Sequence, residues 1–445
     1  MTVTSCAEVV STKLQRIAEL ASRHRVLTTL AHHVDVTWLH EAYRRTRKGG
    51  AVGVDRQTAS EYAADLEGNL RSLHERFRNG TYRAPPVRRV HIPKGDGRKT
   101  RPIGIPTFED KVLQRAVAMV LEPIYEQDFL DCSYGFRPGR SAHQALEALQ
   151  KGLWRMHGGW VVEVDIERFF DTLDHPHLRA MLDRRMKDGV LRRVIHKWLK
   201  AGVLEDGCVK HPESGSPQGG VISPLLANIY LHEVMDTWFE RDVRPRLQGR
   251  CFMVRYADDM VVVCEQEGDA RKLLEVLPKR FGRYGLRLHP DKTRLVRFPR
   301  PSLRGPGDGI RPGSFNFLGF THHWGKSRRG CWIVQRKTAK DRFTRALRRI
   351  RDWCRGHRHW SLDAQHRALS QKLQGHYGYY GITGNARALV CFHFQVERAW
   401  RAWLDRRAWK ARMTWERFNR LLQRYPLPPA RVVHSIYRPS AKPTA

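Results

Sequence analysis

Three aspartates have the setting that metal-dependent chemistry needs. Asp165 ends the apolar segment 160–166, and Asp258 and Asp259 interrupt the apolar segment 252–263 almost a hundred residues later. A carboxylate beside an apolar strand is costly unless a cation or another partner compensates its charge. Mg2+ prefers hard oxygen ligands and leaves room for substrate phosphates. Two such ions, about 3.5 to 4 Å apart, activate a hydroxyl and stabilise a leaving pyrophosphate. The pattern therefore points to nucleotidyl transfer.

The alternative for any Asp-Asp pair is a solvated turn without chemistry. Here Tyr256 and the run MVVVC flank the pair, and a second strand also ends in aspartate, which favours the metal site. Adjacent side chains of a regular strand point to opposite faces, so neighbouring aspartates approach one ion only where the chain bends. We therefore predict that 252–263 is a tight hairpin with its turn at Ala257-Asp258.

The remaining chain supplies elements that could position these carboxylates. We predict a mainly helical segment 7–80 that ends at Asn79-Gly80, and a hairpin 87–105 with a basic tip around Gly95-Asp96-Gly97. Apolar residues at helical spacing predict a buried helix over 107–125, which Thr107 and Asp110 open as a capping box.

The second half of the chain alternates strands, helices and a loop. The strand 160–166 precedes a helix that opens at Asp174 with Pro176. Four prolines and four glycines predict an exposed loop over 299–314. FNFLGFTHHW is predicted to be one strand, and 336–423 to be a long helical stretch.

Charge narrows the class of partner. The chain has 445 residues, which suggests two or three domains, and 80 Lys and Arg against 45 Asp and Glu give a net charge of +35. Such an excess implies a polyanionic partner. The sequence has no apolar run of about 18 residues and no signal-peptide core, so nucleic acid is favoured over a membrane.

The C-terminal quarter is the most basic part. Residues 331–445 carry 25 Lys and Arg against 6 Asp and Glu, and eight of the 13 tryptophans lie at or after position 324. Basic helices with interleaved aromatic residues can neutralise phosphates and stack on unpaired bases. The alternative is that most of these tryptophans form the core of a helical bundle, which leaves the arginines unexplained.

Cysteines and histidines give no metal pattern. The eight cysteines are scattered without a C-x-x-C pair, which is typical of reduced thiols in a cytosolic protein. His32-His33 and His322-His323 lack a second ligand pair at useful spacing, so we interpret them as surface histidines of a basic protein.

In its ordered motifs the sequence resembles the reverse transcriptases encoded by bacterial group II introns, also called intron maturases. The motifs follow one another through nearly the whole chain, and their combination is far more specific than YADD or PQGG alone. They are RRTRKGGAVGVD (44–55), IPKGDGRKTRPIGIPTFEDKVLQ (92–114), YGFRPGRSAHQAL (134–146), VDIERFFDTLDH (164–175), GSPQGGVISPLLANIYLHEVMD (215–236), RYADDMVVV (255–263), GLRLHPDKT (285–293) and FNFLGF (315–320).

The resemblance implies an α+β fold, in which a right-hand polymerase with fingers, palm and an antiparallel palm sheet precedes an all-α thumb or maturase region. It places an N-terminal helical extension of the fingers at 1–80, fingers and palm at 81–325, the thumb or maturase (X) domain at 326–435, and a disordered tail at 436–445.

The resemblance also assigns the metal ligands. Asp165, Asp258 and Asp259 match the family's catalytic aspartates, and two Mg2+ ions per active site are implied. Asp165 and Asp258 should bridge the two ions, the backbone carbonyl of Ile166 should be a further ligand, and Asp259 should be more peripheral.

Four further residues match the site of the incoming dNTP. Lys94 and Arg101 match fingertip cations that hold the triphosphate, and Gln218 matches the glutamine beside the nucleotide. Phe170 matches an aromatic gate that would collide with a 2′-hydroxyl and so favour deoxynucleotides. The alternatives are a solvated charge for Lys94, an ordinary loop residue for Gln218 and core packing for Phe170, whose neighbour Phe169 should be buried.

The segments 373–385 and 402–422 resemble the maturase region that grips intron RNA. Tyr377, Tyr379 and Tyr380 are candidates for base or sugar contact, or equally for a buried cluster between helices. The chain departs from long family members after about 435, and no paired-cysteine His-Asn-His endonuclease module follows. We therefore expect no target-strand cleavage, and priming from another 3′ end such as a nascent strand.

The function that the resemblance implies is an RNA-directed DNA polymerase of a group II intron, which also binds the intron RNA and assists its splicing and mobility. Its partners would be intron RNA, an RNA template, a DNA primer and dNTPs in the bacterial cytoplasm; nothing specifies an oligomeric state. The alternatives are a non-catalytic RNA-binding splicing cofactor and a related enzyme recruited to phage defence or DNA repair. A protein that no longer polymerises DNA would have no need to keep Asp165, Asp258 or Gln218. All three are present, which favours the active enzyme.

Overall fold

A computed structural model describes the chain as two compact units. The residues described are 6–94, 99–205, 208–210, 215, 219–301, 313–327, 329–407 and 412–435. The first unit comprises 1–149 and 160–295, and the second comprises 150–159 and 296–445. The expected domain boundary near 325 therefore differs from this division, which groups the segment 296–325 with the C-terminal helices. The expected tail 436–445 lies outside the described residues.

The first unit begins with helices, as predicted for 7–80. They are α1 (Cys6–Arg23), a short 3-10 turn (Ala31–His33), α2 (Val36–Arg45), α3 (Ala59–Ala63) and α4 (Leu66–Arg78). Asp35, Thr58 and Asp65 each accept a backbone N–H at a helix start. The last of these helices ends at Arg78 with Asn79 as its C-cap, and Gly80 follows with φ 74°, which confirms the predicted stop.

The predicted hairpin consists of β1 (Val87–Lys94) and β2 (Lys99–Ile105), which pair antiparallel. Its tip, around Gly95-Asp96-Gly97, lies outside the described residues. β1 also pairs in parallel with β4 (Val203–Glu205), which pairs with β5 (Cys208–Lys210), so the sheet is mixed and has the order β2-β1-β4-β5.

Helix α5 (Phe108–Tyr125) is largely buried, as its apolar spacing predicts. The Thr107 side chain accepts the Asp110 N–H at its start, and 13 of its residues are buried. The helix packs against α1 and α2. The other helices are α6 (Ala142–Arg155), α7 (Phe169–Thr172), α8 (His175–Asp183), α9 (Gly189–Lys200), α10 (Ser223–Leu231) and α11 (Glu267–Gly282).

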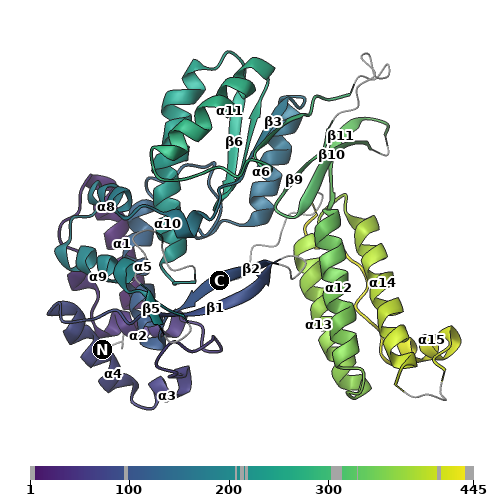
Figure 1. The fold of residues 1–445 in the computed structure, drawn as a ribbon, viewed down its shortest axis with the longest axis horizontal. Coiled ribbons are helices and arrows are strands. Elements are labelled where there is room, and N and C mark those ends of the chain that lie inside the picture. Colours follow the sequence, from purple (N-terminus) through teal and green to yellow (C-terminus); the bar gives the residue numbers. More distant parts are fainter. Residues whose placement is uncertain are drawn as a thin grey trace. The chain divides into compact units, whose positions relative to one another are not determined.

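The sheet that carries the aspartates is formed by β3 (Trp160–Val164), β6 (Cys251–Tyr256), β7 (Asp259–Cys264) and β8 (Arg294–Arg297). Its order is β6-β7-β3-β8, and β7 runs antiparallel to both β6 and β3. Helix α11 packs against β3 and β7 and covers one face of this sheet (Figure 1). The predicted opening of the next helix is confirmed, because Asp174 caps α8 and Pro176 lies in its first turn.

The second unit begins with a three-stranded sheet, and here two predictions were wrong. FNFLGFTHHW is two strands, β9 (Phe315–Phe317) and β10 (Phe320–Lys326), because Leu318 and Gly319 take positive φ values of 48° and 77° and turn the chain. The strand β11 (Trp332–Thr338) pairs with β10, so the predicted helical stretch begins at Lys340, not at 336.

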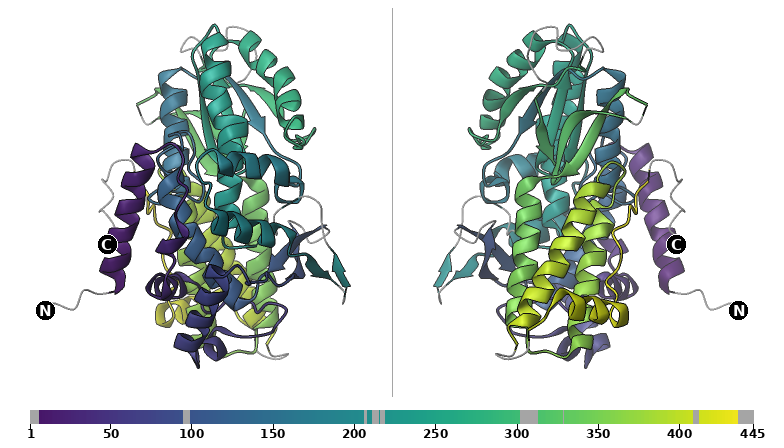
Figure 2. Two further views of the ribbon diagram at one scale, coloured as in Figure 1. Left: turned by 90° about the vertical axis from the view of Figure 1, so that its left-hand side faces the viewer. Right: turned by 90° about the vertical axis from the view of Figure 1, so that its right-hand side faces the viewer.

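Four helices complete this unit: α12 (Lys340–Gly356), α13 (Leu362–Tyr380), α14 (Ala386–Asp405) and α15 (Trp415–Arg424). The first three run alongside one another in Figures 1 and 2 and enclose an apolar core. Trp400 is fully buried in that core, as the packing alternative predicts, whereas Trp360 and Trp415 are 49% and 41% exposed.

The interpretation of the histidine pairs as surface residues was wrong for one member of each pair. His33 and His322 are buried. His322 stacks on Phe315 with ring centroids 4.8 Å apart, and burial lowers its pKa to about 3, so it is a neutral aromatic core residue. The described helices include none that is both long and apolar enough to cross a membrane.

Candidate functional site

The predicted hairpin turn is present and tight. Tyr256 and Asp259 form the last pair between β6 and β7, so Ala257 and Asp258 alone make the turn. Ala257 takes a left-handed φ of 57°, which a two-residue hairpin turn of this hand requires at its first position. Asp258 therefore stands at the tip of two buried strands, as the sequence predicted.

Antiparallel pairing brings Asp165 to the same end of the sheet. Val164 is paired with Met260, so the residue that follows β3, Asp165, lies across from Asp259. Opposed residues in such a ladder have Cα atoms about 4.5 to 5.5 Å apart. The negative charge of Asp165 also reaches Asp258 and helps to raise its pKa. Carboxylates more than ninety positions apart in sequence thus converge.

The electrostatics leave Asp258 in need of a cation. Burial raises the pKa of Asp258 and the charge of Asp165 raises it further, while Arg101 and Arg255 act in the opposite direction. Within the described part of the chain no three His, Cys, Asp or Glu side chains cluster as a metal cage. Mg2+ usually takes one or two carboxylates and completes its shell with water and substrate phosphates, so two convergent carboxylates fit this ion.

A lysine that the sequence analysis did not single out contacts Asp165. The Lys292 ammonium lies 2.9 Å from Oδ2 of Asp165. The Asp165 backbone is held as well, because its carbonyl accepts the His289 N–H at 2.8 Å. Lys292 belongs to the motif GLRLHPDKT, so the signal was the motif itself, but only tertiary contact shows which carboxylate the lysine meets.

Ile166, the predicted backbone ligand, faces Leu288 in an isolated antiparallel bridge. The hydrogen bonds of this bridge run from Glu167 N to Arg287 O and from His289 N to Asp165 O, so neighbouring residues make them. The carbonyl of Ile166 is therefore not consumed by this bridge.

The structure describes only some of the residues predicted to bind the dNTP. Arg101 is exposed on β2, and its charge reaches Asp258 and lowers the pKa of that carboxyl group. Lys94 ends β1 opposite Lys99, but its side chain lies outside the described residues, and so does the whole of Gln218. The hairpin β1-β2 thus brings at least one cation towards the aspartates.

Phe170 lies in the first turn of α7, a short helix that follows Arg168, which has a left-handed φ of 48°. The Phe170 ring is half-buried and packs edge-on against Phe169 with centroids 5.4 Å apart. Phe169 is buried, as predicted. Phe170 therefore keeps an accessible part of its ring while core packing holds the remainder.

Two glycines show where the loop of motif GSPQGG is anchored. A side chain on Gly215 would lie 3.0 Å from the Phe170 carbonyl oxygen, and one on Gly219 would lie 2.5 Å from the Gly104 carbonyl oxygen of β2. Both take positive φ, at 96° and 119°. Gly219 therefore packs closely against the hairpin strand β2, where a side chain would not fit.

A buried polar network that the sequence analysis missed holds the start of the segment after this loop. Oε1 of Gln114 accepts the Val221 N–H at 2.7 Å, and Nε2 of Gln114 donates to Asp110. Asp110 also accepts hydrogen bonds from Tyr82 and Trp198. Burial raises the Asp110 pKa to about 6. Only the Thr107 half of the predicted capping box is therefore shown, because the Asp110 carboxylate accepts its hydrogen bonds from Tyr82, Trp198 and Gln114.

The three candidate tyrosines Tyr377, Tyr379 and Tyr380 make contacts within the second unit. Tyr377 is buried and its hydroxyl lies 3.0 Å from Nδ1 of His393. The Tyr379 hydroxyl donates to the Leu318 carbonyl at 2.8 Å, and the ring of Tyr380 packs on Phe320. Of the two alternatives left open for this cluster, the structure favours the buried one.

Sequence comparison shows the family to which the chain belongs. Residues 92–322 match the family described as reverse transcriptase (RNA-dependent DNA polymerase), and the chain belongs to this family.

Three relatives show where in the family the similarity lies. The chain is 36% identical to the group II intron-encoded protein LtrA of Lactococcus lactis subsp. cremoris over 285 residues, which is 60% of this chain and 46% of that protein. It is 37% identical to protein YkfC of Escherichia coli (strain K12) over 297 residues, 58% of this chain and 76% of that protein. It is 27% identical to nuclear intron maturase 2, mitochondrial, of Arabidopsis thaliana over 231 residues, 43% of this chain and 30% of that protein. The chain thus spans about half the length of the Lactococcus relative.

Proposed function

We propose that this protein is the RNA-directed DNA polymerase of a group II intron, with a second role in binding the intron RNA and assisting its splicing and mobility. The observation that carries the proposal is the convergence of Asp165 with Asp258 and Asp259 at one end of the sheet β6-β7-β3. Membership of the reverse transcriptase family and similarity to a group II intron-encoded protein support it.

Asp165 and Asp258 would hold two Mg2+ ions, with the Ile166 carbonyl as a further ligand and Asp259 at the periphery. The ions supply a more acidic primer hydroxyl and neutralisation of the leaving pyrophosphate. The chain's own contribution is to keep two carboxylates close together in a partly buried setting, where burial raises the pKa of Asp258 and repulsion by the charge of Asp165 adds to that rise. That repulsion gives the pair a preference for divalent cations.

The incoming dNTP would lie between this carboxylate cluster and the β1-β2 hairpin. Arg101, with Lys94, would neutralise the triphosphate, and Arg101 is already close enough to act on Asp258. Gln218 would lie beside the nucleotide, and Phe170 would exclude a 2′-hydroxyl with the exposed part of its ring. The first unit would then be fingers and palm of a right-hand polymerase.

The second unit would be the thumb and maturase region that contacts RNA. Helix α12 is amphipathic: Leu347, Ile350 and Cys354 are buried, and the opposite side exposes arginines. Such a basic surface neutralises phosphates of an RNA backbone. The exposed arginines are Arg342, Arg348, Arg349, Arg351 and Arg355.

Primer extension by the purified protein tests the enzymatic proposal. We expect DNA synthesis on an RNA template in the presence of Mg2+ and none in EDTA. Asp258→Asn should abolish extension while RNA binding, measured by filter retention, stays within about twofold, because the loss of one carboxylate leaves the basic surface intact. Asp259→Asn should be less severe.

The same assay separates the alternatives. RNA binding without extension by the unaltered protein would favour the non-catalytic splicing cofactor. Extension without enhanced splicing of a group II intron RNA would favour a polymerase recruited to another role, such as defence or repair. Full extension by Asp258→Asn would remove Asp258 from the metal site.

A further inference from the structure

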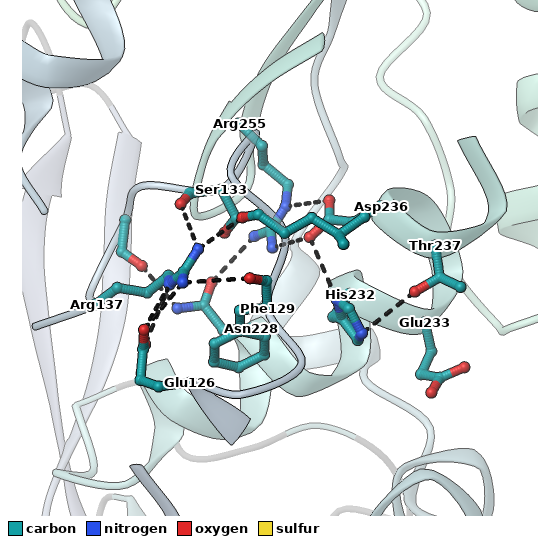
Figure 3. A network of polar contacts seen from close by, with 12 residues as sticks. Glu126, Phe129, Ser133, Arg137, Asn228, His232, Glu233, Asp236, Thr237 and Arg255 are labelled. Atoms are coloured by element: carbon teal, nitrogen blue, oxygen red, sulfur yellow. Dashed lines mark hydrogen bonds and ion pairs between the residues drawn. The ribbon is translucent and has the colours of Figure 1, made fainter. Parts of the chain in front are cut away.

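A buried arginine lies directly behind the turn that carries Asp258. Arg255 is inaccessible to solvent, and so is the side chain of Asp236, with which it pairs. Its guanidinium donates to both oxygens of that carboxylate, at 2.7 Å from Nε and 2.5 Å from Nη2 (Figure 3). A buried charge is tolerated only when its pairing is nearly complete.

The remaining hydrogen bonds of this guanidinium reach the turn itself. Nη1 of Arg255 donates to Oδ1 of Asn228 at 3.0 Å and to the carbonyl oxygen of Ala257 at 3.1 Å. That carbonyl belongs to the peptide group between Ala257 and Asp258. Because a peptide group is planar, a contact that fixes its oxygen also fixes the direction in which the next residue leaves it.

The backbone of Arg255, just before the turn, is also hydrogen-bonded to the neighbouring segment 132–135. Arg255 N donates to Cys132 O at 2.7 Å, and Arg255 O accepts from Tyr134 N at 2.9 Å. Gly135 lies so close that a side chain there would approach Ala257 N to 2.4 Å. The segment 132–135 therefore leaves the turn little room to move.

The supporting contacts close a ring around Arg255. Nδ2 of Asn228 donates to Gly135 O at 2.6 Å, so one amide side chain joins the arginine to the segment beside the turn. Arg137 donates to Ser133 O at 2.8 Å and pairs with Glu126, which holds that segment from behind (Figure 3). Asp236 ends a π-helical turn, His232–Asp236, a backbone form found often beside functional sites.

We infer that Arg255 is a positioning residue for the active site: it holds the Ala257-Asp258 peptide so that the Asp258 carboxylate faces Asp165. This inference rests on the proposed function of the two aspartates. Left-handed geometry is unfavourable for a non-glycine residue, so Ala257 needs a partner that stabilises it. The Arg255 contact to the Ala257 carbonyl supplies one, and it comes from the residue two positions earlier on β6.

A merely structural ion pair would stabilise the fold without affecting the metal site, and the two roles can be separated. Arg255→Lys keeps the charge, but an ammonium cannot donate at once to two carboxylate oxygens, an amide and a carbonyl. The readout is Mn2+ binding by the full-length protein without nucleic acid, followed by the electron paramagnetic resonance signal of free Mn2+. Sites that persist in Asp258→Asn are subtracted.

We expect the Mn2+ dissociation constant of Arg255→Lys to rise at least about tenfold, the range seen when groups behind a metal ligand are altered. The Mg2+ concentration for half-maximal primer extension should rise in parallel, while RNA affinity and the circular dichroism spectrum stay unchanged. Asn228→Ala keeps the Arg255–Asp236 pair and loosens the turn, so it should give a smaller rise in the same direction.

Asp188→Asn is the control for a change in a buried polar contact elsewhere in the first unit. Asp188 is buried at the start of α9 and accepts the Leu30 and Ala31 N–H groups, at 2.7 and 2.9 Å. It should lower the unfolding temperature without changing Mn2+ affinity.

Four outcomes would contradict the inference or the proposed function on which it rests. Unchanged Mn2+ affinity in folded Arg255→Lys overturns the inference. If that variant does not fold, unchanged affinity in Asn228→Ala overturns it instead, as does an equal weakening of Mn2+ binding in Asp188→Asn. If the unaltered protein binds no more Mn2+ than Asp258→Asn and extends no primer, the proposed function itself fails.

Discussion

The ammonium of Lys292 lies 2.9 Å from Oδ2 of Asp165, where it neutralises a carboxylate proposed to bind Mg2+. Both side chains are partly exposed, at 57% and 31%, so solvent screens the pair. A cation that binds Asp165 must share or displace this contact. The lysine therefore competes with a metal ion in the absence of substrate.

Replacing Lys292 should make metal binding tighter. Exposed ion pairs are worth about 0.2 to 1 kcal/mol, so Lys292→Gln should lower the Mn2+ dissociation constant by at most about fivefold. The change is measurable from free Mn2+ without nucleic acid. Arg294→Gln is the control, because it removes the same charge from the same segment while Arg294 pairs with Glu163 instead. Weaker binding in Lys292→Gln would contradict the competition.

Neutralising Asp258 should stabilise the metal-free protein. Burial, with the charge of Asp165, raises the pKa of Asp258, so the folded state holds this proton more tightly than the unfolded state does. Stability from this group is then lost as pH rises from the ordinary carboxyl range through the raised pKa. Asp258→Asn should therefore unfold at a higher temperature than the unaltered protein in EDTA at about pH 7.5, and the difference should shrink towards about pH 4.

Mg2+ provides the internal check on that result. It should raise the unfolding temperature of the unaltered protein and leave Asp258→Asn nearly unchanged, because ligand binding stabilises only the form that binds it. A variant less stable than the unaltered protein at both pH values would show that Asp258 makes favourable contacts in the metal-free state.

Shortening Phe170 should relax the choice of sugar. Phe170→Val removes the part of the ring that would meet a 2′-hydroxyl, so the ratio of ribonucleotide to deoxynucleotide incorporation should rise by about tenfold or more, roughly 1.4 kcal/mol. Single-nucleotide extension with each substrate measures it. Phe169→Val, which alters a buried ring beside it, should lower stability and leave the ratio unchanged. An unchanged ratio in Phe170→Val would indicate that Phe170 serves in core packing and does not select the sugar.

The exposed arginines of α12 should set the salt dependence of RNA binding. Changing Arg348, Arg349, Arg351 and Arg355 to Gln should flatten the plot of log affinity against log salt by about 0.7 to 0.9 for each phosphate that the helix no longer neutralises. The matched control changes four arginines that pair with carboxylates in the first unit: Arg71, Arg192, Arg244 and Arg271. Equal slopes for the two variants would show that α12 does not bind the RNA backbone in particular.

Local signals in the sequence predicted most elements correctly. The alternation of apolar residues on either side of Ala257-Asp258 predicted the hairpin and its turn, and the spacing within 107–125 predicted α5 with its Thr107 cap. The errors fell where a short segment could serve two structures. Leu318-Gly319 turns the chain inside an apparent single strand, and 332–338 forms an edge strand that overlaps the start of the predicted helical stretch.

The burial of individual polar side chains was also not predictable from the local sequence. The His322 imidazole was expected on the surface of a basic protein, but in the fold it stacks on Phe315 in the core. Whether a polar ring is buried depends on which segment lies against it, and that segment is chosen by the whole chain.

The order of residues was enough to predict which carboxylates end apolar strands and which cations precede them, and to indicate a family of proteins in which these motifs occur in this order. How those groups are held depended on the tertiary fold. The β3-β7 register brings Asp165 across from Asp259 and next to the turn that carries Asp258. Lys292 contacts Asp165, and Arg255 joins Asp236 and Asn228 to the Ala257 carbonyl. A motif consists of residues close together in the sequence, whereas these contacts join groups up to 127 positions apart. The distances between such groups are set by the packing of the elements that separate them in the chain.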